Sequence, residues 1–213
     1  MQATRILAIR HGETAWNVDT RIQGQLDIGL NDTGRWQAQR LGQALAQESV
    51  AAVYSSDLQR AMHTAQAVAE PHRSLGLQVT AEPALRERHF GVFQGRTWAE
   101  IEAHWPDQAT QWRQRTPQWA PEGGESLWAL RERVSACVQR LASAHLGAQI
   151  VLVAHGGVMD ALYRLATGLD VQAPRSWALG NAAINRLLWT PDALTLVGWG
   201  DVSHLDHASL DEL

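Results

Sequence analysis

Residues 6–14 read ILAIRHGET and residues 150–157 read IVLVAHGG, so two distant apolar runs end in the same His-Gly pair. Short apolar runs of this kind are typical of buried strands in a parallel sheet. The carboxyl ends of parallel strands meet at one edge of the sheet, where α/β proteins bind their ligands. We therefore expect His11 and His155 to lie close together. The glycine after each, Gly12 and Gly156, allows a tight turn whose N–H groups can face a ligand.

The rest of the chain alternates strands with helices. Apolar runs predict further strands at 50–54, 77–80, 183–189 and 194–199, the last two joined by a turn at Pro191 and Asp192. Amphipathic patterns predict helices from Asn31 or Asp32 to 45, from about 57 to 69, from 126 to 145 and from 158 to 167, with Ser55, Ser56 and Asp57 capping the second. This order predicts an α/β fold of three layers, a largely parallel sheet flanked by helices on both faces, in one domain over residues 1–213.

Residues 97–124 differ from the rest because they contain no strand pattern. Tryptophans recur there at intervals of seven, nearly two helical turns, at positions 98, 105, 112 and 119. Prolines at 106, 117 and 121 exclude one continuous helix. We expect two short helices and a loop that form a small lid-like insertion. The tryptophans are expected to pack on the body of the domain, whether or not the lid closes.

The composition limits the classes of function. All 18 basic residues are arginines, which excludes P-loop and Schiff-base lysine chemistry. The net charge of −4 does not favour non-specific nucleic-acid binding, and no apolar run approaches the roughly 20 residues of a membrane span. Cys137 is the single cysteine, so no internal disulfide can form. We expect a cytoplasmic protein with no nucleic-acid or membrane partner and, because the remaining histidines lack ligand spacing, no metal.

Two arginines complement the two histidines. Arg10 precedes His11, and Arg60 falls in the first turn of the helix predicted from about 57. Side chains in a first turn lean back toward the helix N-terminus, here toward the strand ends, and the helix dipole there favours an anion. Guanidinium groups bind phosphate oxygens in pairs. The sequence therefore predicts a pocket for a compact anion such as a phosphate group.

These motifs closely resemble those of the histidine phosphatase superfamily, which contains the cofactor-dependent phosphoglycerate mutases and many small phosphatases. The resemblance opens with Arg10 to Thr14 and Asn17, and continues in the family's order through 21–24, 30–34, 55–61, 85–95, 123–126 and 153–157. An ordered set of this size is far more specific than a lone Arg-His-Gly. It implies a phosphoglycerate mutase-like fold and phosphoryl-transfer activity.

The resemblance also implies a role for each matched residue. His11 would be the nucleophile that becomes phosphohistidine, and Glu87 would donate a proton to the leaving oxygen, helped by partial burial. The phosphoryl oxygens would be held by Arg10, Arg60, Asn17 and His155, while Gln23 and Gly24 fall where relatives contact substrate. His11 must then present a neutral nitrogen, with its other nitrogen donating to a backbone carbonyl, whereas a cationic His155 would supply a donor. Without the resemblance, Glu87 would instead be expected to form a salt bridge with Arg86 or Arg88.

The same residues serve two reactions, which differ in whether water or a hydroxyl group takes the phosphoryl group from His11. True mutases resemble Phe-Thr-Gly-Trp where this chain reads Ile-Gln-Gly-Gln at 22–25, and they carry a longer insertion after the block matching 87–95. We therefore expect a phosphomonoester hydrolase that acts on a small phosphorylated metabolite and requires no cofactor. The alternative is a cofactor-dependent phosphoglycerate mutase, primed by 2,3-bisphosphoglycerate. A non-catalytic phosphate-binding module is a third reading, although the expected nucleophile and acid are both present.

The sequence leaves the physiological substrate and the oligomeric state open. The residues of the insertion and those around Gln23 are expected to set the substrate. The last two runs, 183–189 and 194–199, are expected to form a sheet edge, which either pairs with a second copy of the chain in a homo-oligomer or is simply blunted.

Overall fold

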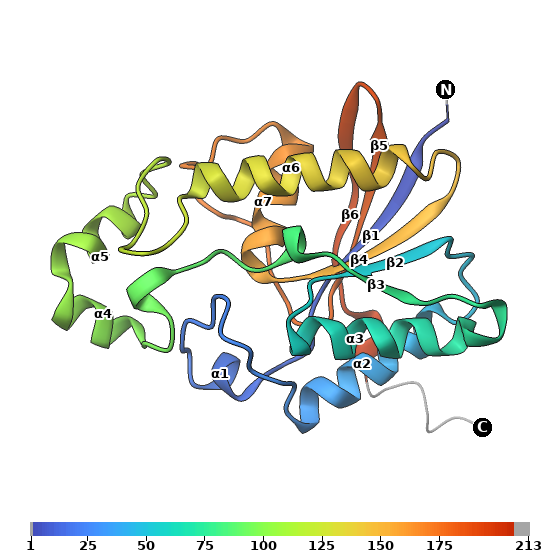
Figure 1. Cartoon of the computed structure of the whole chain (residues 1–213), viewed down its shortest axis with the longest axis horizontal. Helices are drawn as coiled ribbons and strands as arrows, with labels where there is room; N and C mark the ends of the chain where they lie inside the picture. Colours follow the sequence, from blue (N-terminus) through green and yellow to red (C-terminus); the bar gives the residue numbers. More distant parts are fainter. Residues whose placement is uncertain (1, 207–213) are drawn as a thin grey trace.

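The computed structural model, which describes residues 2–206, is built on one six-stranded sheet (Figure 1). The strands are β1 Thr4–Arg10, β2 Ala52–Ser55, β3 Val79–Ala81, β4 Gln149–Ala154, β5 Ile184–Thr190 and β6 Ala193–Asp201. Their order across the sheet is β3-β2-β4-β1-β5-β6. The first four are mutually parallel, whereas β5 runs antiparallel to β1 and β6 antiparallel to β5. The prediction of a largely parallel sheet is confirmed.

The antiparallel edge has a local cause. Only Pro191 and Asp192 separate β5 from β6, as the sequence predicted, and a two-residue connection can join only antiparallel strands. The edge strand β6 alternates exposed and half-buried residues, whereas β4 is buried along its whole length. The centre of the sheet therefore lies at β1 and β4, the two strands that end in histidine.

Two pairs of helices cover the two faces of the sheet and complete the predicted three layers (Figure 1). The helices α2 Asp32–Leu45 and α3 Gln59–Ala69 pack on one face, and α6 Leu127–Ser143 and α7 Gly156–Thr167 pack on the other. Because side chains alternate along a strand, Ile6 and Ala8 join the core under α6 and α7. Leu7 and Ile9 join the core under α2 and α3.

The helices α2 and α6 start where the sequence predicted, whereas α7 starts at Gly156 instead of about 158 and α3 at Gln59 instead of about 57. Asn31 caps α2 by accepting the Gly34 N–H at 2.8 Å, and Ser126 caps α6. The prediction that Ser55, Ser56 and Asp57 cap α3 is wrong, because that helix follows Leu58 and has no side-chain cap of its own. The Gln59 N–H instead donates to Asp27 Oδ1 at 2.7 Å.

Residues 97–124 contain two short helices and a loop. They lie at the end of the molecule toward which the carboxyl ends of the parallel strands point (Figure 1). The helices are α4 Trp98–His104 and α5 Pro106–Arg113. The tryptophans at 98, 105, 112 and 119 pack around a small core of their own, formed by Phe93, Ile101 and Ala109. Phe93 comes from outside the insertion, so this core ties the insertion to the domain. A lid function for the segment remains a prediction.

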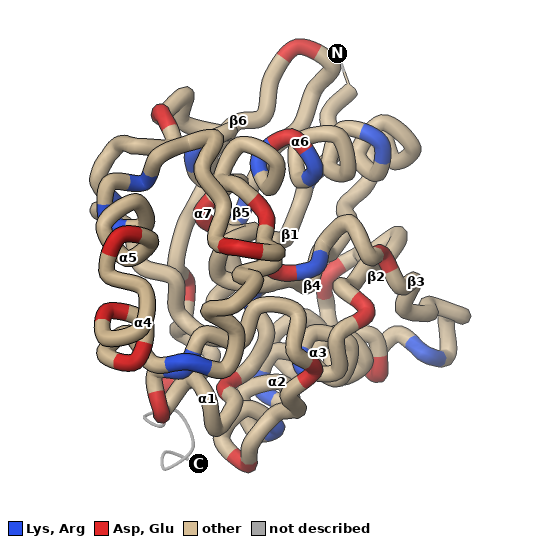
Figure 2. Tube along the Cα trace, turned by 60° about the vertical axis from the view of Figure 1, so that its left-hand side comes forward, with Lys and Arg blue, Asp and Glu red and all other residues tan. Residues whose placement is uncertain are grey.

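The shorter elements connect these layers. They are the helix α1 Ala15–Val18 and the 3₁₀ turns η1 Glu70–Leu75, η2 Pro83–Leu85, η3 Gly91–Phe93 and η4 Ser203–Leu205. None of the helices within residues 2–206 has the length and apolar character that crossing a membrane requires. Acidic and basic positions are interspersed over the molecule (Figure 2).

Candidate active site

The two histidines meet at the carboxyl edge of the sheet. In the parallel ladder of β1 and β4, Arg10 is the register partner of Ala154, and the His11 N–H donates to the Ala154 carbonyl at 2.9 Å. His11 and His155, which follow these two register partners, are thereby brought together at the edge of the sheet. The ring centroids of His11 and His155 lie 5.1 Å apart, with an angle of 58° between the ring planes.

The hydrogen bonding of His11 fixes its tautomer. Its Nδ1 lies 2.7 Å from the Gly12 carbonyl, and since a carbonyl only accepts, Nδ1 carries the proton. The pKa of His11 is held well below 6.5, chiefly by burial and further by the charges of Arg60 and Arg10, although the Gly12 carbonyl opposes the shift. The ring is therefore neutral at neutral pH, and its Nε2 has a free lone pair.

His155 is also neutral, so the case of a cationic ring, which the sequence left open, does not apply. Burial is the largest cause that lowers its pKa well below 6.5, followed by the charge of Arg60. Its Nε2 lies 2.8 Å from Ser56 Oγ, which accepts the Leu58 N–H at 3.4 Å. We assign the Ser56 hydroxyl proton to Nε2, which leaves the proton of the neutral ring on Nδ1. His155 is thus a donor without being a cation.

The two arginines are anchored by carbonyl groups. Arg60, which is 1% exposed, donates from Nη1 to the Leu26 carbonyl at 2.8 Å and from Nη2 to the Gly24 carbonyl at 2.7 Å. Arg10 donates from Nη1 to the carbonyl of Leu179. Burial lowers the pKa of Arg60 to about 10, so it remains charged at neutral pH. Neither guanidinium forms an ion pair with a carboxylate within residues 2–206.

Three buried donor atoms at this site have no partner among the described residues: Arg10 Nε, Arg60 Nε and His155 Nδ1. Buried donors are nearly always hydrogen-bonded, and each unpaired one costs about 1–3 kcal/mol. An anion with several oxygens would satisfy all three together. The arrangement around His11 therefore matches a phosphate group in charge and in the number of acceptors that it offers.

The neighbouring loop brings three further predicted residues to the site. Asn17 and Thr14 form a capping box at the start of α1, in which Asn17 Oδ1 accepts the Thr14 N–H at 3.0 Å. Asn181 also donates to this Oδ1, at 3.3 Å, so the amide nitrogen is the end of Asn17 left for a ligand. Gln23 has a buried Oε1 without a described partner, and the carbonyl of Gly24 holds Arg60.

Glu87 lies at the N-terminus of α7. Its two carboxylate oxygens accept the Gly157 N–H at 3.1 and 3.0 Å, and Oε1 also accepts the Arg88 N–H at 2.7 Å. A Cβ at position 157 would lie 2.2 Å from Oε1 of Glu87, so a side chain there would displace this carboxylate. The charge of Glu87 raises the pKa of both Arg10 and Arg60, which places it beside the same cluster.

The salt bridge considered for Glu87 does not form. Arg86 pairs with Asp57 at 2.5 Å, and the Arg88 side chain turns away to donate to the Glu125 carbonyl at 2.7 Å. The carboxyl group of Glu87 is therefore bound by backbone N–H groups alone among the described residues.

Two supporting residues were missed from the sequence. Arg133 of α6 pairs with Glu125 at 2.7 Å and donates to the carbonyls of Ala84 and Arg86, which fixes the loop that carries Glu87. Ser56 orients His155, although the sequence suggested a helix cap for it. No local pattern indicates either role, because each partner is distant in sequence.

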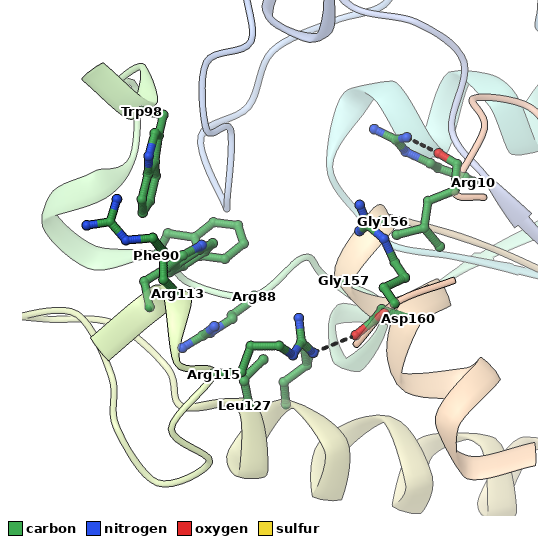
Figure 3. A pocket seen from close by; sticks show the side chains of 14 residues that line it. Arg10, Arg88, Phe90, Trp98, Arg113, Arg115, Leu127, Gly156, Gly157 and Asp160 are labelled. Carbon is green, nitrogen blue, oxygen red and sulfur yellow. Dashed lines mark hydrogen bonds and ion pairs between the residues drawn. The ribbon is translucent and has the colours of Figure 1, made fainter. Parts of the chain in front are cut away.

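A cavity of about 830 Å³ opens beside the predicted phosphate site around His11 (Figure 3). Arg10, Gly156 and Gly157 form its inner end, and side chains from the segment 88–115 line the opposite side. Within residues 2–206, no three His, Cys, Asp or Glu side chains gather as metal ligands would.

Comparison with known proteins agrees with this geometry. Residues 6–202 match the model of the histidine phosphatase superfamily, branch 1. The chain belongs to this superfamily. It is 42% identical to phosphoglycerate mutase-like protein 4 of Arabidopsis thaliana, over 94% of this chain and 86% of that protein. It is 36% identical to the metal-independent phosphoserine phosphatase of the same plant, over 96% and 84%.

A solved structure of another histidine phosphatase extends the comparison. It is the mycobacterial glucosyl-3-phosphoglycerate phosphatase, determined as a complex with VO3. The two chains are 35% identical, and they superpose with a TM-score of 0.80 over 94% of this chain and 99% of that one. The fold is thus shared with this phosphatase along nearly the whole chain.

The protonation of the histidine pair can be tested by NMR titration. Because burial and the neighbouring arginines lower both pKa values well below 6.5, both rings should stay neutral as the pH falls from 8 to about 6. Imidazole ¹⁵N shifts should show the Nδ1–H tautomer for each ring. Spectra of His11→Asn and His155→Asn variants would assign the signals. A midpoint at or above 6.5 for either ring would contradict the expected neutrality.

Proposed function

We propose that this histidine phosphatase hydrolyses a small phosphomonoester through a covalent phosphohistidine at His11. The observation that carries the proposal is the set of three unpartnered buried donors, Arg10 Nε, Arg60 Nε and His155 Nδ1, beside an unprotonated nitrogen of His11. A nucleophile with an available lone pair and fixed donors for phosphoryl oxygens are the two requirements of this reaction.

In the first step, His11 Nε2 attacks the phosphorus atom and the ester P–O bond breaks. The leaving oxygen takes a proton from the carboxylic acid form of Glu87, and an alcohol departs. The Gly12 carbonyl accepts the Nδ1–H of His11 throughout, so the ring presents the same nitrogen and stabilises the positive charge that forms on it.

In the second step, water attacks the phosphorus atom of phosphohistidine. Glu87, now a carboxylate, accepts a proton from this water, the P–N bond breaks, and inorganic phosphate leaves. The free enzyme is restored with His11 neutral and Glu87 protonated, so atoms and protons balance over the cycle.

The fixed donors supply the stabilisation of the transition state. The transferred group spreads negative charge over its equatorial oxygens, and one well-placed donor is commonly worth about 3 kcal/mol. Arg10 and Arg60 bring full charges, while His155 and Asn17 bring neutral donors. Because the carbonyls that anchor the arginines do not neutralise them, their charge remains available to the phosphoryl group.

A cofactor-dependent phosphoglycerate mutase is the second candidate, supported by the likeness to a plant protein named phosphoglycerate mutase-like. Hydrolysis is favoured by the likeness to a phosphoserine phosphatase and a glucosyl-3-phosphoglycerate phosphatase, and by the Ile-Gln-Gly-Gln sequence at 22–25. The proposal includes a cytoplasmic location, because a chain with one cysteine forms no internal disulfide. Pairing of two copies through the edge strand β6 stays a prediction.

The role of His11 is tested by His11→Ala. Loss of the nucleophile should lower kcat/KM about a thousandfold or more on any phosphomonoester. Wild-type enzyme quenched in alkaline denaturant, which preserves the acid-labile P–N bond, should also carry one phosphoryl group on the peptide that contains His11, measured by mass spectrometry. His63→Ala, at an exposed position of α3, is the matched control and should keep full activity. A phosphoryl group on another side chain would contradict the mechanism.

The role of Glu87 is tested by Glu87→Gln. Aryl oxides leave without a proton, whereas alkoxides need an acid, so alkyl phosphates should lose at least tenfold more activity than p-nitrophenyl phosphate. The exposed Glu132→Gln is the control for loss of a carboxylate. Equal losses on both classes of ester would show that Glu87 is not the proton donor.

Hydrolysis and mutase activity are separated by a product assay. With 3-phosphoglycerate as substrate, release of inorganic phosphate should exceed formation of 2-phosphoglycerate, and added 2,3-bisphosphoglycerate should not reverse the ratio. Both products are measured in the same samples. Formation of 2-phosphoglycerate in excess over phosphate would favour the mutase.

A further inference from the structure

A short turn at residues 179–182 contacts the carboxyl end of β1. The Ala182 N–H donates to the carbonyl of Arg10 at 3.0 Å and to that of His11 at 3.3 Å. The Leu179 carbonyl accepts a hydrogen bond from the Arg10 guanidinium. The turn therefore binds both the main chain and a side chain at the point where the strand delivers the expected nucleophile.

The side chain of Asn181, in the same turn, has an acceptor for each proton of its amide nitrogen. Nδ2 donates to the His11 carbonyl at 3.0 Å and to Asn17 Oδ1 at 3.3 Å. A carbonyl only accepts, so the main chain of His11 determines which end of the Asn181 amide faces it. The same nitrogen then requires the oxygen end of Asn17, which leaves the Asn17 amide nitrogen for a phosphoryl oxygen.

Thr14 holds the oxygen of Asn17 by a different route. The Thr14 N–H donates to Asn17 Oδ1 at 3.0 Å and the Thr14 hydroxyl donates to it at 3.1 Å, within the capping box of α1. These bonds fix Asn17 to the start of its own helix. The bond from Asn181 instead ties Asn17 to the main chain of His11, and it sets the donor and the nucleophile relative to one another.

The turn is held in a backbone conformation that costs energy. Ala182 is fully buried and has a φ of 57°, in the left-handed region that residues other than glycine seldom adopt. Such conformations persist where the surrounding contacts over-determine them, and they cluster at functional sites. Here the strained residue is the one whose N–H bonds the carbonyls of Arg10 and His11.

Aromatic side chains anchor the chain that leads into the turn. Trp177 stacks on Tyr163 of α7, with ring centroids 4.0 Å apart and an angle of 15° between the planes. Trp199 of β6 donates from Nε1 to the Ala178 carbonyl at 2.8 Å and packs edge-on against Tyr163. The turn is thereby fixed to a helix and to an edge strand, as a positioning element requires.

We propose that Asn181 is a positioning residue of this site, which fixes the Asn17 donor relative to the nucleophilic nitrogen of His11. The inference rests on the proposed function. Because both protons of its amide are engaged, Asn181 acts through Asn17 and does not bind the substrate itself. Donors stabilise a transition state only when they are aimed at the oxygens that gain charge, so loosening this link should lower the rate.

A double-mutant cycle tests the assignment. Asn181→Ala should lower kcat/KM on p-nitrophenyl phosphate about tenfold, and Asn17→Ala should lower it at least as much. If Asn181 acts through Asn17, the double variant should lie within about twofold of Asn17→Ala. Ser176→Ala, at an exposed position of the same segment, is the control and should keep full activity. Losses that multiply in the double variant would overturn the assignment.

Binding of inorganic vanadate separates this inference from the proposed function. Vanadate adds to a nucleophile as a five-coordinate mimic of phosphoryl transfer, so its affinity in calorimetry reports the aim of the donors without turnover. Asn181→Ala should weaken vanadate binding about tenfold, and the double variant should bind it about as weakly as Asn17→Ala. If the wild type hydrolyses no phosphomonoester, the proposed function fails and the cycle on vanadate still decides the role of Asn181.

A merely structural role for Asn181 gives a different result. It would lower the thermal midpoint of Asn181→Ala but leave vanadate affinity and kcat/KM unchanged well below that midpoint. This result would overturn the inference while leaving the phosphatase intact. If Asn181→Ala does not fold, Asn181→Ser replaces it in the cycle, because serine keeps a donor for the His11 carbonyl but is too short to reach Asn17 as well.

Discussion

The parallel pairing of β1 with β4 is the constraint on which the rest of the structure depends. It sets Arg10 against Ala154, and therefore brings the rings of His11 and His155 to 5.1 Å. A shift of the register by one residue would also send the alternating side chains of β1 to the wrong faces of the sheet. Since both faces are packed with apolar side chains, the core itself enforces the register that the chemistry requires.

The same edge solves an electrostatic problem. A site for a phosphate group needs positive charge, yet the proposed nucleophile, His11 Nε2, must stay unprotonated. The fold meets both needs by burying His11 beside Arg10 and Arg60, because burial and the two cations both lower the pKa of its ring. The arginines remain charged themselves, since even the lowered pKa of Arg60, about 10, lies far above neutral pH. The arginines proposed to attract the substrate therefore also help to keep His11 neutral, although burial is the larger cause.

The sequence was sufficient for the features that depend on local patterns. The strands, the helices on both faces, the turn at Pro191 and Asp192 and the meeting of the two histidines all follow from periodicity and strand order. It failed where the partner of a residue is distant. Ser56 is a good capping residue by type, but it bonds His155, 99 positions away. The neutral state of His155 depends chiefly on its burial and then on the charge of Arg60, which no pattern along the chain reveals.

The insertion shows the same limit. Tryptophans spaced by seven indicate a shared face, but the centre of their core is Phe93, which precedes the insertion. The spacing of the tryptophans therefore predicted that they pack, but only the fold identified Phe93 as a residue that they pack against. As a result the insertion is fixed to the same loop region that carries Glu87 and Arg88, so its aromatic side chains line the cavity next to the reacting groups.

The three buried arginines of the described chain show how one residue type serves both architecture and binding. Arg164 pairs with Asp160 at 2.9 Å and donates to the carbonyls of Asp170 and Ala173, which anchors the segment that leads to Arg175. Arg60 and Arg88 have carbonyl partners instead; Arg60 acts by its charge on His11, and Arg88 lines the neighbouring cavity. A carboxylate partner consumes the charge of a guanidinium, whereas a carbonyl fixes its orientation and leaves its charge for a ligand. In a chain without lysine, the choice of partner therefore separates the arginines that hold the fold from those proposed to meet the substrate.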